Sequence, residues 1–431
     1  MKYYFLLGWC GLWLTQPLLA QNLQSQAHRI LIDAPGFDQA NVGICLYDPG
    51  KHEYLYRHND RRYFTPASNT KLLSLYAGLC YLGDSTSGIQ YQLWGDTLYI
   101  RGTGDPSVLH PDFAVQPVWE FLTRQSRPIV LTEPAWETLP YGPGWAWDDF
   151  QEAFQPERSA MPLYGNVARF LATGGTLTVI PEHFAGDLVS EGSGDDRAAA
   201  MARDPLRNVF YFGAANGPSF AREVPFLTSG PLTAALWADT LHKPVLYRPG
   251  VSLPGPWKSV ANVPLDSLLQ IMMHRSDNFF AEQTDLMVSA RLFDTLSTSR
   301  IIAYLLEEAF RNLPDTPRWV DGSGLSRYNL FTPRDLVAVL AKLYGEFSSD
   351  RLDAILPTGG QGTLAGLYHD MAGAIFAKTG SLSNNQALSG RLVTRKGHIL
   401  LFSIMVGNCL VPSRQISLAM ERFLRFVWET Q

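Results

Sequence analysis

The sequence predicts an α+β fold that is interrupted by a mostly β insert. Two short strand-like runs precede the first helical pattern, and helical spacing of apolar residues returns after Pro264. Three further strand-like runs and one amphipathic helix close the chain. Between these parts the chain is rich in Gly, Pro and Trp and carries few helix signals. Strands and helices are thus expected in separate stretches, which is typical of the α+β class.

Changes in composition divide the chain into four segments. Residues 1–20 have the form of a secretory signal peptide, with an early positive charge, a short apolar run and a small residue, Ala20, before the expected cleavage point. Residues 21–83 and 259–431 are expected to form two parts of one domain, and residues 84–258 the insert. No apolar run after the signal is long enough to span a membrane, so we expect no transmembrane span in the mature chain.

Charge and cysteine content exclude several classes of function. The net charge is −5 and Lys and Arg form no dense run, which argues against binding to nucleic acid. Three cysteines follow the signal, Cys45, Cys80 and Cys409, and their odd number and wide spacing indicate neither a disulfide framework nor a zinc site. The histidines are scattered without a His-Glu-x-x-His pair. We therefore expect no metal and no cofactor.

The first elements are predicted to be a β-hairpin and a helix. Val42–Tyr47 and Glu53–Tyr56 alternate like strands around a turn that contains Pro49 and Gly50. The hairpin leads into a helix that begins near Pro66, because proline has a fixed φ and suits a helix start. A second hairpin, Ile89–Trp94 with Thr97–Arg101, is expected to open the insert.

The helix that follows Pro66 carries the pattern Ser68-x-x-Lys71. Residues three apart lie on one face of a helix, so the hydroxyl and the amine are expected to meet. A lysine that is neutral can take the proton of a serine hydroxyl, and desolvation or a nearby cation favours the neutral form. The free N–H groups at the helix start favour a developing oxyanion. The pattern is short and also occurs at ordinary helix starts, so it indicates a nucleophile only in combination with other motifs.

A second motif, Ser276-Asp277-Asn278, lies between two predicted helices. Apolar residues at helical spacing precede it and follow it, so the motif is expected at a helix–helix junction. Side chains at such a junction can point into a cleft. The alternative is an ordinary helix N-cap, which Ser, Asp and Asn all suit.

The C-terminal part is predicted to be three antiparallel strands and a helix. The strands are Ile375–Lys378, Gln386–Val393 and Ile399–Val406, and the helix is Pro412–Trp428. A third motif, Lys378-Thr379-Gly380-Ser381, is expected at the end of the first strand. Gly380 has no side chain, which would let a substrate backbone approach the strand edge.

The three motifs together are far more specific than any one of them. Ser68-x-x-Lys71, Ser276-Asp277-Asn278 and Lys378-Thr379-Gly380 occur in the order that is typical of penicillin-binding proteins and serine β-lactamases. Each is predicted on the kind of element that the chemistry needs. The chain resembles the D-Ala-D-Ala carboxypeptidase/endopeptidase family of low-molecular-mass, class C penicillin-binding proteins, the penicillin-binding protein 4 type. The likeness covers nearly the whole mature chain.

Further stretches carry the same resemblance. They are Gly104-Asp105-Pro106, Gly144–Asp149, Asp321–Asn329 and Phe376–Leu382. The chain departs from the family in a shorter insert and in Val108, where a leucine is usual. The resemblance implies a serine β-lactamase/transpeptidase-like fold, in which an antiparallel sheet is flanked by helices and interrupted by an insert.

The resemblance also implies a role for each motif residue. Ser68 would be the acyl-forming nucleophile and Lys71 its base. Ser276 and Asn278 would relay protons and position the peptide, and Lys378 would lower the pKa of Lys71 and attract a carboxylate.

The remaining implied roles concern substrate binding. Thr379 and Ser381 would bind the terminal carboxylate beside Gly380, and the backbone N–H groups of Ser68 and Ser381 would form the oxyanion hole. Asp149 would reach from the insert to an amine on the peptide. From its sequence alone, however, the stretch around Asp149 is equally consistent with a structural turn that carries two packed indoles.

The function implied is that of a serine-type D-Ala-D-Ala carboxypeptidase, with endopeptidase activity left open. Its partners would be peptidoglycan stem peptides and, as covalent inhibitors, β-lactam antibiotics, in the periplasm after secretion. Two alternatives stay open: a serine β-lactamase-like hydrolase of the same fold, and a penicillin-binding sensor without turnover. A lipase-like hydrolase is disfavoured because the chain has no Gly-x-Ser-x-Gly.

Overall fold

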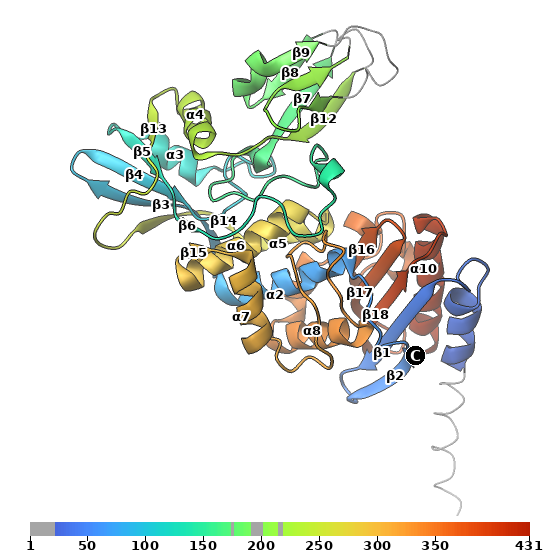
Figure 1. Cartoon of the computed structure of the whole chain (residues 1–431). Coiled ribbons are helices and arrows are strands. Elements are labelled where there is room, and N and C mark those ends of the chain that lie inside the picture. The colour runs from blue at the N-terminus through green and yellow to red at the C-terminus, as the bar shows by residue number, and fades with distance from the viewer. Residues whose placement is uncertain (1–21, 174–175, 191–200, 214–218) are drawn as a thin grey trace, which may run out of the picture.

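The computed structural model describes residues 22–173, 176–190, 201–213 and 219–431 (Figure 1). The expected signal peptide, residues 1–20, lies outside the described residues. Figure 1 shows two lobes, one formed by both ends of the chain and one by its middle. We call the first lobe the catalytic part and the second the insert.

A five-stranded antiparallel sheet forms the centre of the catalytic part, in the order β16-β17-β18-β1-β2. Its strands are β1 (Asn41–Asp48), β2 (Glu53–His58), β16 (Ile375–Leu382), β17 (Asn385–Val393) and β18 (Ile399–Gly407). The predicted N-terminal hairpin and the three predicted C-terminal strands are all present. Pairing of β1 with β18 joins them, with Ile44 opposite Ile404, so the two ends of the chain build one sheet.

Helices cover both faces of this sheet (Figure 1). One face packs on η2 (Ala67–Thr70), α2 (Lys71–Tyr81), α5 (Leu265–His274), α6 (Asn278–Phe293), α7 (Thr298–Glu308), α8 (Pro333–Glu346) and α9 (Ser349–Ile355). The other face packs on α10 (Ser413–Thr430), η1 (His28–Ile32) and two short turns, η7 (Gly362–Leu364) and η8 (His369–Met371). Two apolar cores result, one on each face of the sheet. This is the α+β arrangement expected from the sequence.

The helix starts follow from local sequence. Thr332 accepts a hydrogen bond from the Asp335 backbone, and the Asp335 side chain accepts one from the Thr332 backbone, so the pair forms a capping box before α8. Asp277 caps α6 by accepting from the Phe280 N–H. The helix that carries Ser68 begins as a short 3₁₀ turn and becomes an α-helix only at Lys71.

The insert is built around a second five-stranded sheet, in the order β13-β5-β4-β3-β14. Its strands are β3 (Ser85–Trp94), β4 (Thr97–Gly102), β5 (Ile129–Thr132), β13 (Val245–Tyr247) and β14 (Lys258–Pro264). The helices α3 (Pro117–Thr123) and α4 (Gly230–Leu241) pack against it. The predicted hairpin of β3 and β4 is present.

Two smaller sheets and three short turns complete the described part of the insert. The sheets are β12-β7-β8 and β10-β11-β9, formed by β7 (Val167–Thr173), β8 (Thr176–Ile180), β9 (Leu188–Ser190), β10 (Ala202–Arg203), β11 (Phe210–Phe212) and β12 (Phe220–Pro225). The turns are η3 (Trp147–Asp149), η4 (Tyr164–Asn166) and η5 (Glu182–Asp187). Aromatic side chains fill the core between these sheets and α4.

Several contacts join the insert to the catalytic part. Strand β6 (Ala135–Trp136) of the insert pairs with β15 (Thr295–Leu296), which follows α6. Arg101 of the insert forms an ion pair with Asp294 at the end of α6, at 2.6 Å. Both contacts hold the insert against α6, whose other end carries the second sequence motif.

Two properties of the described residues bear on the sequence predictions. None of the helices in these residues is long and apolar enough to cross a membrane. Cys45, Cys80 and Cys409 are all free thiols, with Cys80 exposed and the other two buried.

Candidate active site

The Ser68 hydroxyl lies at the start of a rigidly held helix. The preceding residue, Ala67, has a positive φ of 47°, a conformation that an alanine adopts only when its surroundings enforce it. Gly324 lies so close to this turn that a Cβ there would be 1.9 Å from the Ala67 carbonyl oxygen. Asn69 donates to the Ser389 hydroxyl of β17 at 3.0 Å. These contacts fix the position of Ser68 against both the sheet and the Gly324 loop.

Lys71 is fully buried and donates to three oxygen atoms. Its Nζ lies 2.9 Å from Ser68 Oγ, 2.6 Å from Asn278 Oδ1 and 2.7 Å from the Ser323 carbonyl oxygen. Of these three acceptors, only the Ser68 hydroxyl has a proton of its own to give. A neutral Lys71 would therefore keep its two N–H bonds on Asn278 and Ser323 and turn its lone pair to Ser68. The geometry suits Lys71 as the base for the Ser68 hydroxyl.

The second and third sequence motifs meet through Lys378. Its Nζ donates to Ser276 Oγ and to the Thr379 carbonyl oxygen, both at 2.8 Å, and its side chain is fully buried. Ser276 has a positive φ of 61°, which places a strained serine at the junction of α5 and α6. The structure thus brings the five motif residues together as two hydrogen-bonded groups, Lys71 with Ser68 and Asn278 and Lys378 with Ser276, and the charge of Lys71 acts on Lys378.

Both lysines have lowered pKa values. Burial lowers the pKa of Lys71 to about 8, while the neighbouring carboxylates act in the opposite direction. Burial, and next the charge of Lys71, hold the pKa of Lys378 well below its usual value. From the sequence we expected Lys378 to lower the pKa of Lys71, but the main cause of this lowering is desolvation. The two buried amines together release a proton more readily than an exposed lysine does.

Strand β16 is longer than predicted and forms the edge of the site. Lys378 lies in its middle, and the strand continues through Ser381 to Leu382. The Ala377 N–H donates to the Pro357 carbonyl on the outer edge, so the two-residue period directs the N–H groups of Thr379 and Ser381 to that same edge. The Ser381 hydroxyl donates to Gln386 at 2.8 Å.

Gly380 is needed at its position for a reason that the sequence did not reveal. A Cβ there would lie 2.6 Å from the Pro66 carbonyl oxygen and 3.1 Å from the Ser68 nitrogen. We expected a substrate backbone to need this space, but the chain's own Pro66–Ser68 segment already occupies it. The missing side chain lets β16 come within contact distance of the Ser68 turn.

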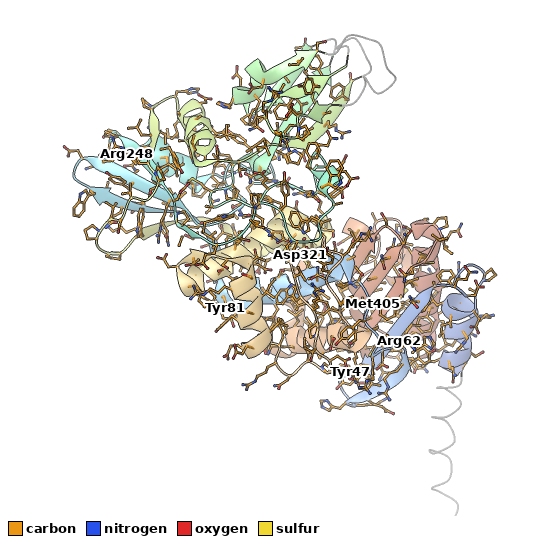
Figure 2. All side chains as sticks on the ribbon, viewed as in Figure 1. Tyr47, Arg62, Tyr81, Arg248, Asp321 and Met405 are labelled. Atoms are coloured by element: carbon orange, nitrogen blue, oxygen red, sulfur yellow. The ribbon has the colours of Figure 1, made fainter. Side chains whose placement is uncertain are left out.

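A buried loop after α7 supplies residues to which the sequence analysis assigned no role. The Asp321 carboxylate accepts hydrogen bonds from the backbone of Gly324 and Ser326, from the Asn329 amide and from the Trp145 indole. This network shapes the loop that presents the Ser323 carbonyl to Lys71. Figure 2 shows Asp321 where the insert meets the catalytic part. The signature over 321–329 indicated the loop, but no sequence signal indicated a backbone carbonyl as the contact.

The insert contacts the site directly. Its Phe154 carbonyl accepts from Asn278 Nδ2 at 3.0 Å, which orients the Asn278 amide so that Oδ1 faces Lys71. A cavity of about 250 Å³ opens on this side, between the insert and the junction of α5 and α6. The cavity is lined in part by Phe154, Ser276 and Asn278 and by two arginines, Arg169 and Arg275.

Asp149 lies in the short 3₁₀ turn η3 of the insert, and its side chain is half-buried. Partial burial and the nearby Asp148 and Glu152 raise the pKa of this carboxyl group, while Arg327 acts against them. The hydrogen bonds found among the described residues include none to its carboxylate. The turn does not carry two packed indoles, as the structural alternative expected. Trp147 is 82% exposed, whereas the Trp145 indole donates to Asp321.

Within the described ranges, no group of three or more His, Cys, Asp or Glu side chains is arranged to hold a metal ion. Lysine, serine and asparagine predominate around Ser68, and an ammonium group is not a metal ligand.

Comparison with known proteins agrees with this geometry. The model of the D-Ala-D-Ala carboxypeptidase 3 (S13) family matches residues 23–183 and 255–426. A D-alanyl-D-alanine carboxypeptidase of Actinomadura sp. is 27% identical over 87% of this chain and 79% of its own length. A carboxypeptidase DacB of Mycolicibacterium smegmatis is 28% identical over 51% of each chain, so this chain matches only about half of that relative.

A solved structure shares the fold. Penicillin-binding protein 4 of Haemophilus influenzae superposes with a TM-score of 0.74 at 19% identity and covers 95% of this chain and 99% of its own. The same protein has also been solved in complex with a β-lactam. The family match spans well over half of the described chain and includes all three motifs. This chain therefore belongs to the D-Ala-D-Ala carboxypeptidase 3 (S13) family of peptidases.

Proposed function

We propose that the chain is a serine-type D-Ala-D-Ala carboxypeptidase that cleaves peptidoglycan stem peptides through an acyl-enzyme on Ser68. The observation that carries this proposal is the set of three acceptors around Lys71 Nζ. Two of them, on Asn278 and Ser323, hold the amine in place, and the third is the hydroxyl that must lose its proton. Family membership supports the peptide bond between two D-alanines as the target.

The reaction runs in two steps on these residues. Ser68 Oγ attacks the carbonyl carbon of the penultimate D-alanine and passes its proton to the neutral Lys71 amine. The C–N bond breaks, the terminal D-alanine leaves with a proton relayed by Lys71 and Ser276, and the acyl group stays on Ser68. Water then hydrolyses this ester and frees Ser68.

The edge of β16 is proposed to bind the reacting end of the peptide. The N–H of Ser381, directed to the outer edge, and the N–H of Ser68 stabilise the oxyanion. The hydroxyl of Thr379, and that of Ser381 once it turns from Gln386 to the substrate, bind the terminal carboxylate together with the charge that Lys378 carries when protonated. These roles rest on the position of β16 beside the Ser68 turn.

Asp149 is proposed to select the substrate. Its half-buried carboxylate lies in the insert, near Arg327, and has no hydrogen-bond partner among the described residues, so it can accept from an amine on the stem peptide. The exposed Trp147 beside it offers an apolar surface for the side chain that carries this amine. β-Lactams without such an amine would acylate Ser68 but make no use of this contact.

This function implies a cellular location for the enzyme and a class of covalent inhibitor. Stem peptides lie outside the inner membrane, which agrees with the signal peptide expected in residues 1–20, so we propose a periplasmic enzyme. β-Lactams are proposed to acylate Ser68 and block the site, as the complex of the Haemophilus influenzae protein suggests by analogy.

Mass spectrometry of products tests the proposal. The purified chain is incubated with muropeptides that end in D-Ala-D-Ala and with cross-linked dimers. We expect loss of one D-alanine from the pentapeptide, abolished in Ser68→Ala. Cleavage of the dimer would add endopeptidase activity. Rapid turnover of a chromogenic cephalosporin without peptide cleavage would instead identify a β-lactamase, and acylation without any turnover would identify a sensor; either result would overturn the proposal.

A further inference from the structure

We propose that Arg158 of the insert and Glu282 of α6 form a buried ion pair through which the insert sets the protonation of the Lys71 amine. They are positioning residues, since neither touches the Ser68 hydroxyl. The inference rests on the function proposed above, in which Lys71 is the base. It assigns a role in the chemistry to a residue of the insert that none of the three motifs contains.

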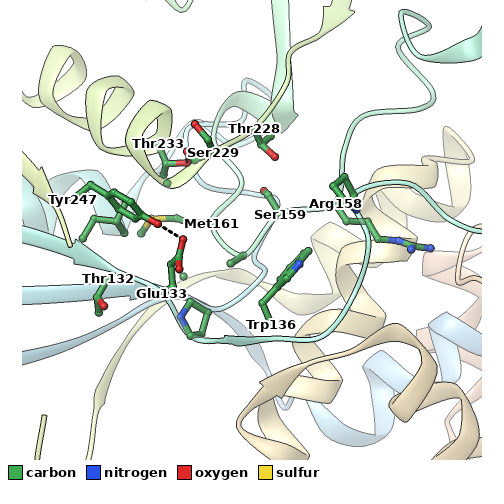
Figure 3. Close-up of a pocket in the computed structure, with 16 residues that line it drawn as sticks. Thr132, Glu133, Trp136, Arg158, Ser159, Met161, Thr228, Ser229, Thr233 and Tyr247 are labelled. Carbon is green, nitrogen blue, oxygen red and sulfur yellow. Dashed lines mark hydrogen bonds between the residues drawn. The ribbon is translucent and has the colours of Figure 1, made fainter. Parts of the chain in front are cut away.

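The ion pair is buried, and two nitrogen atoms of Arg158 donate to one oxygen of Glu282. Arg158 Nε and one terminal nitrogen lie 2.9 and 2.6 Å from the same oxygen of Glu282, and the two side chains are only 2% and 1% exposed. The guanidinium also lies over the Trp145 ring, 4.8 Å from its centre. Figure 3 shows the Arg158 side chain extending away from the Glu133–Tyr247 side of a neighbouring cavity. Arg158 thus lines that cavity in part, while its guanidinium group contacts Glu282 of α6.

The other oxygen of Glu282 is connected to Lys71 through the backbone of Ser323. Glu282 Oε1 accepts from the Ser323 N–H at 2.8 Å, and the Ser323 carbonyl accepts from Lys71 Nζ at 2.7 Å. Glu282 lies four residues after Asn278, one turn along the same face of α6. Apart from the Ser68 hydroxyl, the two oxygen atoms that accept from the Lys71 amine are thus fixed by α6 or by a residue that α6 holds.

Other charges also face Lys71, from every element around it. Asp277 lies at the junction of α5 and α6, Asp321 in the loop after α7, and Lys378 on β16, while the buried Asp285 lies on α6 near Glu282. Among the carboxylates that raise the pKa of Lys71, only Glu282 forms an ion pair with an arginine in the described part of the insert. The charge of Arg158 offsets that of Glu282, so the insert controls how strongly Glu282 favours the ammonium form.

Removal of Glu282 and removal of Arg158 should therefore shift the pKa of Lys71 in opposite directions. Without the Glu282 charge, the ammonium form of Lys71 loses an attractive neighbour, so the pKa of Lys71 falls. Without the Arg158 charge, Glu282 acts uncompensated and the pKa of Lys71 rises. A pair that merely joined the two lobes would weaken folding in both cases and would not shift the pH dependence in opposite directions.

The test is the pH dependence of the rate constant for Ser68 acylation by penicillin. The rate should rise with pH as Lys71 becomes neutral. Relative to the parent, the midpoint of this rise should move down by about one pH unit in Glu282→Gln and up by about one pH unit in Arg158→Gln. Arg158→Lys keeps the charge and should stay near the parent midpoint, and the double variant Glu282→Gln with Arg158→Met should return toward it.

Arg101→Gln is the matched control, because Arg101 also pairs an insert residue with α6, at the end of the helix far from Lys71. Its midpoint should not move. Thermal unfolding followed by circular dichroism identifies a variant that fails to fold, and the Arg158→Lys and Arg158→Gln pair then still decides the question. Unmoved midpoints, or shifts in the same direction, would overturn the inference. Absence of acylation in the parent would overturn the proposed function instead.

Discussion

The catalytic part and the insert differ in the side chains that they bury. Beneath Ser68 the catalytic part buries ionisable side chains, among them Lys71, Lys378, Asp285 and Asp321. The insert has an apolar core that includes the aromatic side chains Phe170, Phe184, Phe210 and Trp237, and outside this core it also buries a few charged side chains, such as Glu157, Arg158 and Arg203. Charged groups are costly to bury and are retained where their perturbed pKa values serve chemistry. We propose that the insert acts on the reaction through its edge, where Phe154, Arg158 and Trp145 reach the catalytic part.

The largest expected effect separates the stability of the insert from catalysis. Trp237 is fully buried in the insert core, so Trp237→Ala should lower the free energy of unfolding by about 3–5 kcal/mol. Because Trp237 does not contact the site, the acylation rate of the folded protein should change little. Urea unfolding and penicillin acylation, measured on the same sample, check this. A large loss of acylation in a protein that is still folded would show that packing in the insert core affects the reaction at Ser68.

The next effect concerns the charged interior. Arginine keeps the charge of Lys71 but stays protonated, so Lys71→Arg should slow penicillin acylation by about a hundredfold or more. Lys342→Arg is the control, since Lys342 forms a surface pair with Glu346. Stopped-flow acylation of the two variants makes the comparison. A rate near that of the parent would reduce Lys71 to a structural role.

The same lysine predicts the direction of the pH dependence. The pKa of Lys71 is lowered from its usual value to about 8, so its neutral fraction grows as the pH rises through about 8. The acylation rate constant should accordingly rise by about tenfold per pH unit well below this value and level off above it. A pH series with penicillin tests this. A rate that falls over the same range would indicate that the protonated amine is required.

A smaller effect is expected at the edge of the insert. Asp149→Asn should leave penicillin acylation nearly unchanged and slow the cleavage of amine-bearing muropeptides by about 5- to 150-fold, the value of one charged contact of about 1–3 kcal/mol. The readout is the ratio of the two rates in parent and variant. Equal losses with both substrates would mean that Asp149 supports only the local turn.

Sequence could predict the parts of the site whose residues carry their own local signals. The start of the Ser68 helix, the Ser276–Asn278 junction and the strands around Lys378 all follow from periodicity, proline and turn residues. The pairing of β1 with β18 has no local signal, because it joins residues more than 350 positions apart. Long-range register depends on tertiary packing, which a single sequence does not display.

The site contacts that were missed are of two kinds. The Ser323 carbonyl and the Phe154 carbonyl are backbone groups, which any residue type could supply, so no side-chain pattern indicates them. Arg158 and Glu282 lie in different lobes, and only the i, i+4 spacing of Glu282 from Asn278, which the sequence analysis did not use, could have indicated one of them. Gly380 was noted from sequence, but the group that fills its space, Pro66, could be identified only in three dimensions.

Intact-mass spectrometry with benzylpenicillin tests the central claim most directly, namely that Ser68 is the nucleophile that Lys71 activates. We predict a single covalent adduct on the parent, located by peptide mapping to the segment that contains Ser68, and no adduct on Ser68→Ala at the same concentration. Circular dichroism of Ser68→Ala confirms that it is folded. An adduct that persists on the folded Ser68→Ala protein, or that maps to another serine, would contradict the account.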